Sequence, residues 1–192
     1  MSRLILWNVM TLDGCFEGAK GWDLGFHKYA WGPELEHFGL EQLRAADRLL
    51  FGRVTYEGMA AYWQTAKGED ADLMNSIPKV VVSRTLTRVD WANSTLLEGD
   101  LVSGIQALKH QGDKNTFVFG SANLSATLIE HRLFDEYRIA ISPVLLGCGK
   151  PLFSPLPAQQ PLKLLEARTL SNGCVILRYQ PINQQVCPEG NP

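Results

Sequence analysis

The stretch LLFGRVTYEG, residues Leu49 to Gly58, contains the alternation on which the fold is built. An apolar run of strand length ends at Gly52, and a cation, a β-branched pair and a helix-like segment follow it. Bare backbone N–H groups and a guanidinium both bind phosphate oxygens well, so this junction fits a phosphorylated ligand. Taken alone, however, the stretch favours a turn with a solvated arginine, because single motif matches are weak.

Similar apolar runs recur along the chain, and several show no polar alternation, which is typical of strands covered on both faces. They span residues 4–9, 48–52, 79–84, 94–97, 116–120, 136–141, 162–167 and 174–179. Helical patterns lie between them at residues 33–46, 101–110 and 121–131. Pro33 is expected at a first helical position and Ser121 as an N-cap. The alternation predicts crossover units and a largely parallel sheet.

The C-terminal part of the chain departs from this alternation. Asn172-Gly173 lies between two apolar runs and predicts a hairpin with a type I′ turn, which needs positive φ at both central residues. The expected fold class is therefore α/β, with an antiparallel pair at the end of a mainly parallel sheet. Residues 1–182 are expected to form a single domain, and residues 183–192, which are polar with Pro and Gly, a flexible tail.

Composition narrows the classes of function. The chain has 192 residues, 45% hydrophobic and 20% charged, with a formal net charge of -2. This balance gives no long-range attraction to nucleic acid or anionic lipid, so any anion site must be local. No run approaches the roughly 20 apolar residues of a membrane span. The four cysteines and four histidines lack metal-binding spacing, and the N-terminus reads as a strand rather than a signal peptide, so we expect no metal and a cytoplasmic location.

Three predicted strand ends carry small or phosphate-binding residues. They are Gly52-Arg53-Val54-Thr55, Ser83-Arg84-Thr85 and Gly120-Ser121-Ala122-Asn123. Ligands of open α/β sheets bind at the carboxyl ends of strands, so three such strand ends are stronger evidence for a ligand site than one. The last junction also offers helix N-terminal amides to a pyrophosphate. No G-x-G-x-x-G follows a strand here, so the site is not a Rossmann fingerprint.

Five ordered motifs carry a family resemblance: VMTLDGCFEG, LLFGRVTYEGM, KVVVSRTL, FVFGSANLSATLI and LFDEYRIAISPVLLGCGKPLF. Over residues 3–180 the chain resembles the dihydrofolate reductase-like superfamily. It looks most like the reductase domain of the bifunctional riboflavin-biosynthesis deaminase/reductase and its stand-alone relatives. The resemblance implies a three-layer α/β/α fold with a mixed eight-stranded sheet and a C-terminal hairpin. It also implies NADPH binding, hydride transfer to a small-molecule substrate, and a possible homodimer.

The resemblance assigns cofactor contacts by motif position. Val9 and Phe16 would flank the nicotinamide, and Ser83 and Arg84 would bind the adenosine 2′-phosphate. The pyrophosphate would meet two groups of residues, namely Gly52, Arg53, Val54 and Thr55, and Gly120, Ser121, Ala122, Asn123 and Leu124. An arginine and a hydroxyl suit a dianionic phosphate, which predicts a preference for NADPH over NADH.

The sequence predicts the residues of the substrate site less specifically than those of the cofactor site. Asp13 could orient a substrate or relay a proton, or it could simply form a turn before Gly14. Trp22 and Asp23 lie in an irregular segment rich in glycine and aromatic residues, residues 12–32, where they could contact the substrate or pack.

The expected substrate is a conjugated carbonyl or imine, such as a pteridine or a riboflavin-pathway pyrimidine of the 5-amino-6-(5-phosphoribosylamino)uracil type. Two alternatives stay open, namely a true dihydrofolate reductase and a non-catalytic NADPH-binding protein. Glu34 and Glu36 give no clear match to the folate enzymes' carboxylate early in the first helix, which puts dihydrofolate in doubt. The zinc signature of the deaminase half is absent from the sequence.

Overall fold

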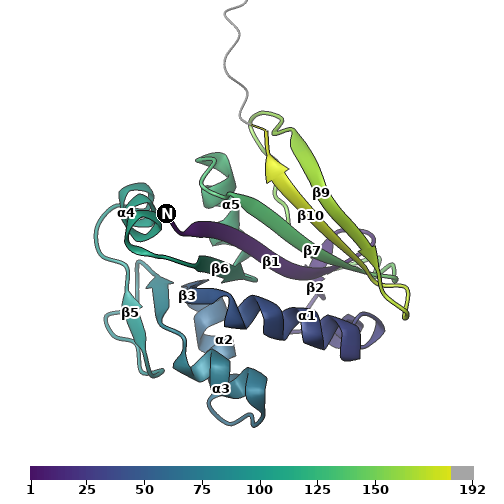
Figure 1. Ribbon diagram of the computed structural model, residues 1–192, viewed down its shortest axis with the longest axis horizontal. Helices are drawn as coiled ribbons and strands as arrows, with labels where there is room; N and C mark the ends of the chain where they lie inside the picture. The colour runs from purple at the N-terminus through teal and green to yellow at the C-terminus, as the bar shows by residue number, and fades with distance from the viewer. Residues whose placement is uncertain (183–192) are drawn as a thin grey trace, which may run out of the picture.

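The computed structural model describes residues 1–182 and is built around an eight-stranded sheet (Figure 1). Its strands lie in the order β5-β4-β3-β6-β1-β7-β10-β9. Their bounds are β1 Arg3–Thr11, β3 Ala46–Gly52, β4 Lys79–Val82, β5 Ser94–Leu96, β6 Asn115–Phe119, β7 Glu136–Ser142, β9 Leu162–Thr169 and β10 Val175–Pro181. The predicted tail, residues 183–192, lies outside the described residues.

All neighbouring strands from β5 to β7 pair in parallel, whereas β10 runs antiparallel to both β7 and β9. The prediction of a mixed, mainly parallel sheet that ends in an antiparallel hairpin is therefore confirmed. The parallel strands require crossover connections, and helices supply most of these.

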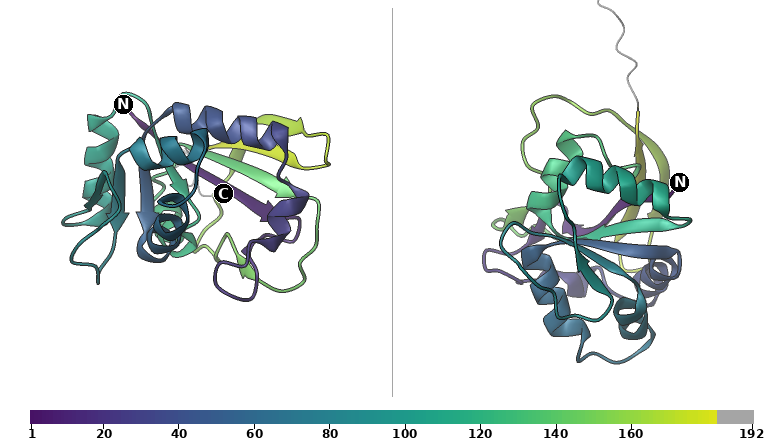
Figure 2. Two further views of the ribbon diagram at one scale, coloured as in Figure 1. Left: turned by 90° about the horizontal axis from the view of Figure 1, so that it is seen from below. Right: turned by 90° about the vertical axis from the view of Figure 1, so that its left-hand side faces the viewer.

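Helices cover both faces of the sheet and give the molecule three layers (Figure 2). One face carries α1 (Pro33–Arg44), α2 (Arg53–Trp63) and α3 (Glu69–Ser76), and the other carries α4 (Leu101–Gln111) and α5 (Ala122–Glu130). Alternate side chains of β1 enter the two cores, Ile5 and Trp7 on the α1 face and Leu4 and Leu6 on the α5 face. Among residues 1–182, none of the helices has both the length and the apolar character that crossing a bilayer demands.

The irregular segment, residues 12–32, contains two short ordered elements that the sequence did not predict. β2 (Cys15–Glu17) pairs antiparallel with β8 (Lys150–Pro151), and η1 (Gly25–Tyr29) is a 3-10 helix. The β2–β8 pair ties this segment to the chain that follows β7. The segments that follow β1 and β7 are therefore joined.

The hairpin turn differs from the predicted type I′ form. Gly173 has a φ of 85°, but Asn172 is not in the positive-φ region, and the amide of Gly173 donates to the carbonyl of Leu170 at 3.0 Å. This is the geometry of a type I turn followed by a left-handed glycine. The Asn172 side chain donates to the carbonyl of Ala30 at 2.8 Å and accepts from the amide of Cys174. The prediction of a type I′ turn was therefore wrong. The contacts of the Asn172 side chain favour the observed turn instead.

A buried carboxylate joins the hairpin to the rest of the sheet. Glu136 of β7 is fully buried, and its oxygens accept from Arg138 at 2.7 Å, Arg178 of β10 at 2.7 Å and Arg3 of β1 at 2.9 Å. Arg138 also donates to Gln42 of α1. Burial alone would raise the pKa of Glu136, but hydrogen bonds from Arg138 and Arg178 and their charges outweigh it and hold the pKa below its ordinary value. Three strands and a helix therefore meet at one ion cluster.

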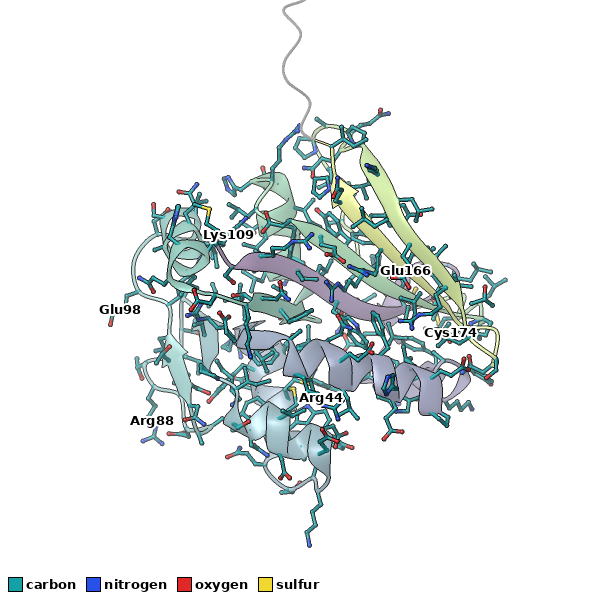
Figure 3. All side chains as sticks on the ribbon, in the orientation of Figure 1. Arg44, Arg88, Glu98, Lys109, Glu166 and Cys174 are labelled. Atoms are coloured by element: carbon teal, nitrogen blue, oxygen red, sulfur yellow. The ribbon has the colours of Figure 1, made fainter. Side chains whose placement is uncertain are left out.

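We expect Glu136→Gln to lower the free energy of unfolding by about 3–5 kcal/mol, because the largely buried Arg138 guanidinium and the partly exposed Arg178 and Arg3 lose their counter-ion. Glu166→Gln is the matched control, since Glu166 (labelled in Figure 3) pairs with Arg178 at 2.9 Å but is partly exposed. It should cost about 1 kcal/mol or less. Urea unfolding of both variants measures the difference, and equal losses would contradict a central role for Glu136.

Candidate functional site

The carboxyl edge of the sheet is notched beside β1, because the two neighbours of β1 end at different heights. On one side, pairing with β6 ends at Trp7, opposite Phe119. On the other side, pairing with β7 continues to Thr11, opposite Ser142. The β6 side of residues 8–11, which we call the β1 notch, therefore has no strand partner within residues 1–182. Such a notch at the carboxyl end of parallel strands is a natural ligand site.

The junction between β6 and α5 borders the β1 notch and makes a tight reversal. Gly120 and Ser121 are both left-handed, with φ of 54° and 57°. A Cβ on Gly120 would lie 3.2 Å from Cγ2 of Thr55, so the position has little room for a side chain. The Gly120 amide leaves the strand ladder and donates to Oδ1 of Asn8 at 2.6 Å.

Reciprocal hydrogen bonds tie the beginnings of α2 and α5 together. The Ser121 amide donates to Oγ1 of Thr55, and the Gly52 amide donates to Oγ of Ser121, both at 3.0 Å. Ser121 occupies the N-cap position as predicted, but its side chain does not cap α5, because the hydroxyl bonds to Gly52 instead. Gly52, the N-cap residue of α2, has no side chain with which to cap that helix.

Two helix N-termini without a side-chain cap from their own N-cap residue therefore meet at this edge. The first-turn amides of a helix have no intrahelical acceptor, and the helix dipole adds positive potential there. In α5 these amides belong to Ala122, Asn123 and Leu124. The arrangement can bind an anion with backbone donors.

The predicted cationic residues lie at the same edge, but they differ in availability. Gly52 and Val82 are register partners, so the β3 and β4 junctions end at one height. Arg53 is exposed and pairs with Glu57 at 3.0 Å, which neutralises part of its charge, while the neighbouring Val54 side chain is exposed. Arg84 is exposed and forms no ion pair with another residue of the described chain. The Ser83 hydroxyl accepts from the amides of residues 85 and 86, which fixes the turn that presents Arg84.

Val9 and Phe16, predicted beside a nicotinamide, belong to different cores. Val9 lies in the β1 notch and is buried on the face covered by α1, whereas Phe16 packs partly buried on the face covered by α5. Of the two, Val9 belongs to the notch itself, and the structure packs Phe16 of β2 against the opposite core.

Asp13 holds two loops together. Its carboxylate accepts from the hydroxyl of Thr11, from the amide of Gly147 at 2.8 Å and from the amide of Leu146 at 3.1 Å. The hydrogen bonds from Thr11 and from these two amides lower the pKa of Asp13 to about 2. The group is therefore ionised at neutral pH and poorly suited to donate a proton.

Trp22 and Asp23 close the segment of residues 18–25 over α2. Trp22 is left-handed, with a φ of 63°, and its amide donates to Glu17. Its indole lies directly against Gly58, where an added Cβ would come within 1.8 Å of Cζ2. The carbonyl of Asp23 accepts from the Gly18 amide at 2.8 Å. Both residues therefore shape the loop beside the candidate site.

Sequence reasoning missed Asn8, the buried residue that begins the β1 notch. Asn8 is only 6% exposed, and while its Oδ1 accepts from Gly120, its Nδ2 has no hydrogen-bond partner in the described structure. The available signal was a single amide side chain inside the otherwise apolar run LILWNV. Its partner, however, lies 112 positions away along the chain.

Comparisons with known proteins agree with this architecture. Residues 3–176 match the family model described as "RibD C-terminal domain". The uncharacterized protein YyaP of Bacillus subtilis (strain 168) is 32% identical, with 92% of this chain and 94% of YyaP covered.

Two solved structures illustrate the shared fold. A putative riboflavin biosynthesis protein from Shewanella sp. PV-4 superposes with a TM-score of 0.79 at 22% identity, covering 94% of this chain and 99% of that one. Dihydrofolate reductase from Enterococcus faecalis, complexed with NADP(H) and RAB-propyl, gives a TM-score of 0.63 at 12% identity and covers 93% of this chain and 96% of its own. The dihydrofolate reductase-like fold is thereby shown.

We expect Asp13→Asn to change how stability depends on pH. The pKa of Asp13 falls from 3.8 to about 2 on folding, so its carboxylate stabilises the folded state above about pH 4, and this contribution is lost as the pH falls toward about 2. The wild type should therefore lose more unfolding free energy than Asp13→Asn over this interval. Urea unfolding at a series of pH values measures it.

Asp23→Asn serves as the control, since the Asp23 carboxylate accepts one long bond of 3.4 Å from the Gly25 amide. Its pH dependence should follow that of the wild type. Parallel curves for the wild type and Asp13→Asn would contradict the stabilising role of the Asp13 carboxylate.

Proposed function

Since the chain belongs to the RibD C-terminal domain family, we propose that it is an NADPH-dependent reductase that transfers hydride to a small conjugated carbonyl or imine. The family match supports a reductase of the riboflavin-pathway type. The observation that carries the proposal is the pair of joined N-termini of α2 and α5 beside the β1 notch.

The residues at this edge fit a dinucleotide diphosphate. Gly120 is left-handed and has no side chain that could cover the start of α5. The Ser121 side chain does not cap the first-turn amides of that helix. Next to Gly120, Asn8 keeps a buried donor that has no partner within residues 1–182. These features suit phosphate oxygens, which accept hydrogen bonds from every side.

The chain's own residues would divide the binding as follows. The first-turn amides of α2, residues 53–55, and of α5, residues 122–124, would hold the pyrophosphate, while Gly52, Gly120 and Ser121 shape the turn around it. Arg84 with the Ser83 hydroxyl would bind the 2′-phosphate. The nicotinamide would lie in the β1 notch against Val9, with Phe16 as a second proposed contact. The cofactor supplies the hydride, and the protein holds the acceptor carbon close and excludes water. Because Asp13 is ionised, we propose that the proton comes from solvent.

A riboflavin-pathway pyrimidine or a pteridine is the proposed substrate class. Dihydrofolate is less well supported, because Glu34, one of two carboxylates in the first turn of α1, already accepts from the amide of Ser171 at 2.8 Å and from its hydroxyl. These hydrogen bonds hold the pKa of Glu34 below its ordinary value. A carboxylate tied to the hairpin is not free to bind a pterin ring.

NADPH oxidation measured at 340 nm against a panel of ribityl-pyrimidine precursors, pterins, dihydrofolate and simple carbonyl compounds tests the proposal. We expect turnover with a pyrimidine or pteridine. Turnover with dihydrofolate alone would favour the folate enzyme. Saturable NADPH binding without oxidation of any compound would indicate a non-catalytic binding protein.

We expect Arg84→Glu to weaken NADPH binding about tenfold or more while NADH binding changes little, because the lost guanidinium contact involves the 2′-phosphate. Arg88→Glu makes the same charge change on the loop between β4 and β5, where Arg88 projects outward and pairs with Asp90 (Figure 3). That control should keep the affinity of the wild type. Calorimetric titration measures both, and equal losses for NADPH and NADH would refute the role of Arg84.

A further inference from the structure

Asn8 combines two features that are seldom found together in a central strand. It is 6% exposed, and Oδ1 accepts from the Gly120 amide at 2.6 Å. Its Nδ2 is also buried but has no partner among the described residues. Buried polar groups are nearly always hydrogen-bonded, so a donor left over at this place requires an explanation.

The orientation of the Asn8 amide is fixed by chemistry. The Gly120 amide is a donor, so the atom that faces it must be the side-chain oxygen. Exchanging the oxygen and nitrogen of Asn8 would place two donors against each other. The unpaired atom is therefore the NH₂ group.

The other buried polar side chains at the start of α5 are already hydrogen-bonded to backbone groups. The Thr55 and Ser121 hydroxyl oxygens accept from the amides of Ser121 and Gly52, and the Ser125 hydroxyl donates to the carbonyl of Gly120 at 3.3 Å. Asn8 thus supplies the unpaired side-chain NH₂ group beside this helix N-terminus, at the point where the β1 notch begins.

We infer that Asn8 is a binding residue that acts from both ends of its amide. Its Oδ1 holds Gly120 in the reversal that opens the N-terminus of α5, and its Nδ2 donates to a pyrophosphate oxygen of the dinucleotide. The inference rests on the proposed function and deepens it, since it explains why an amide, rather than an apolar side chain, stands in this strand. The NH₂ group is covered in the described structure, so the neighbouring side chains must shift for a ligand oxygen to reach it, and binding then gives this donor an acceptor.

Asn8→Asp separates the two roles. The variant keeps the oxygen that accepts from Gly120 but replaces the NH₂ donor with a second oxygen. At pH 8 we expect NADP⁺ to bind about 10- to 100-fold more weakly than to the wild type, the loss of a hydrogen bond to a charged group. As the pH falls toward 5, protonation of the buried carboxyl restores an O–H donor, and the ratio of the two affinities should return toward one.

Two further variants and a second ligand complete the test. Asn8→Leu removes both ends of the amide and should bind NADP⁺ weakly at every pH. Asn115→Asp adds the same charge on β6 at the opposite end of the strand and should stay within about twofold of the wild type. Adenosine 2′-monophosphate lacks the pyrophosphate, so Asn8→Asp should bind it as the wild type does. Calorimetry gives the affinities, and thermal unfolding followed by circular dichroism shows that each variant is folded.

The outcomes are distinct. Wild-type affinity of Asn8→Asp for NADP⁺ at pH 8 would overturn the inference while leaving the proposed function intact. A loss without recovery at low pH, shared by adenosine 2′-monophosphate, would show that Asn8 only supports the local structure, and this also overturns it. No binding of NADP⁺ by the folded wild type would refute the proposed function and the inference together.

Discussion

The early end of β6 is the constraint on which the site depends. Because β6 stops opposite Trp7 while β7 continues to Thr11, the next amide, that of Gly120, has no ladder partner and turns to the side chain of Asn8. That turn needs two left-handed residues, and it delivers the chain directly into α5. One truncated strand therefore produces both the β1 notch and the helix N-terminus that borders it.

The order of elements was readable from the sequence because it depends on local patterns. Apolar runs without alternation indicated buried parallel strands, and Asn172-Gly173 indicated the final hairpin. The turn type was not readable, because Asn172 bonds to Ala30, far away in the chain. β8 was missed because a two-residue strand has no pattern of its own and exists only through its pairing with β2.

The site shows the same division between local and distant information. The three strand ends rich in glycine, serine and arginine were found from the sequence, and the structure brings them to one edge. Their detailed chemistry was hidden, since Ser121 looks like a helix cap until Gly52 is seen beside it. Asp13 looked like a candidate proton donor, yet its pKa is lowered by the Thr11 hydroxyl and also by amides 133 and 134 positions away.

Hydrogen bonds connect the loops beside the candidate site to one another. Asp13 joins the β1–β2 turn to residues 146 and 147, and Glu17 joins the Trp22 amide to Lys150 at 2.6 Å. Gly58 lets the Trp22 indole lie directly on α2. A change in one of these loops would therefore require coordinated changes in the other, whereas the junctions at Gly52 and Gly120 belong to the sheet edge itself. Folds in general can keep such an edge constant while the loops around it vary, and it is the loops that most often determine function.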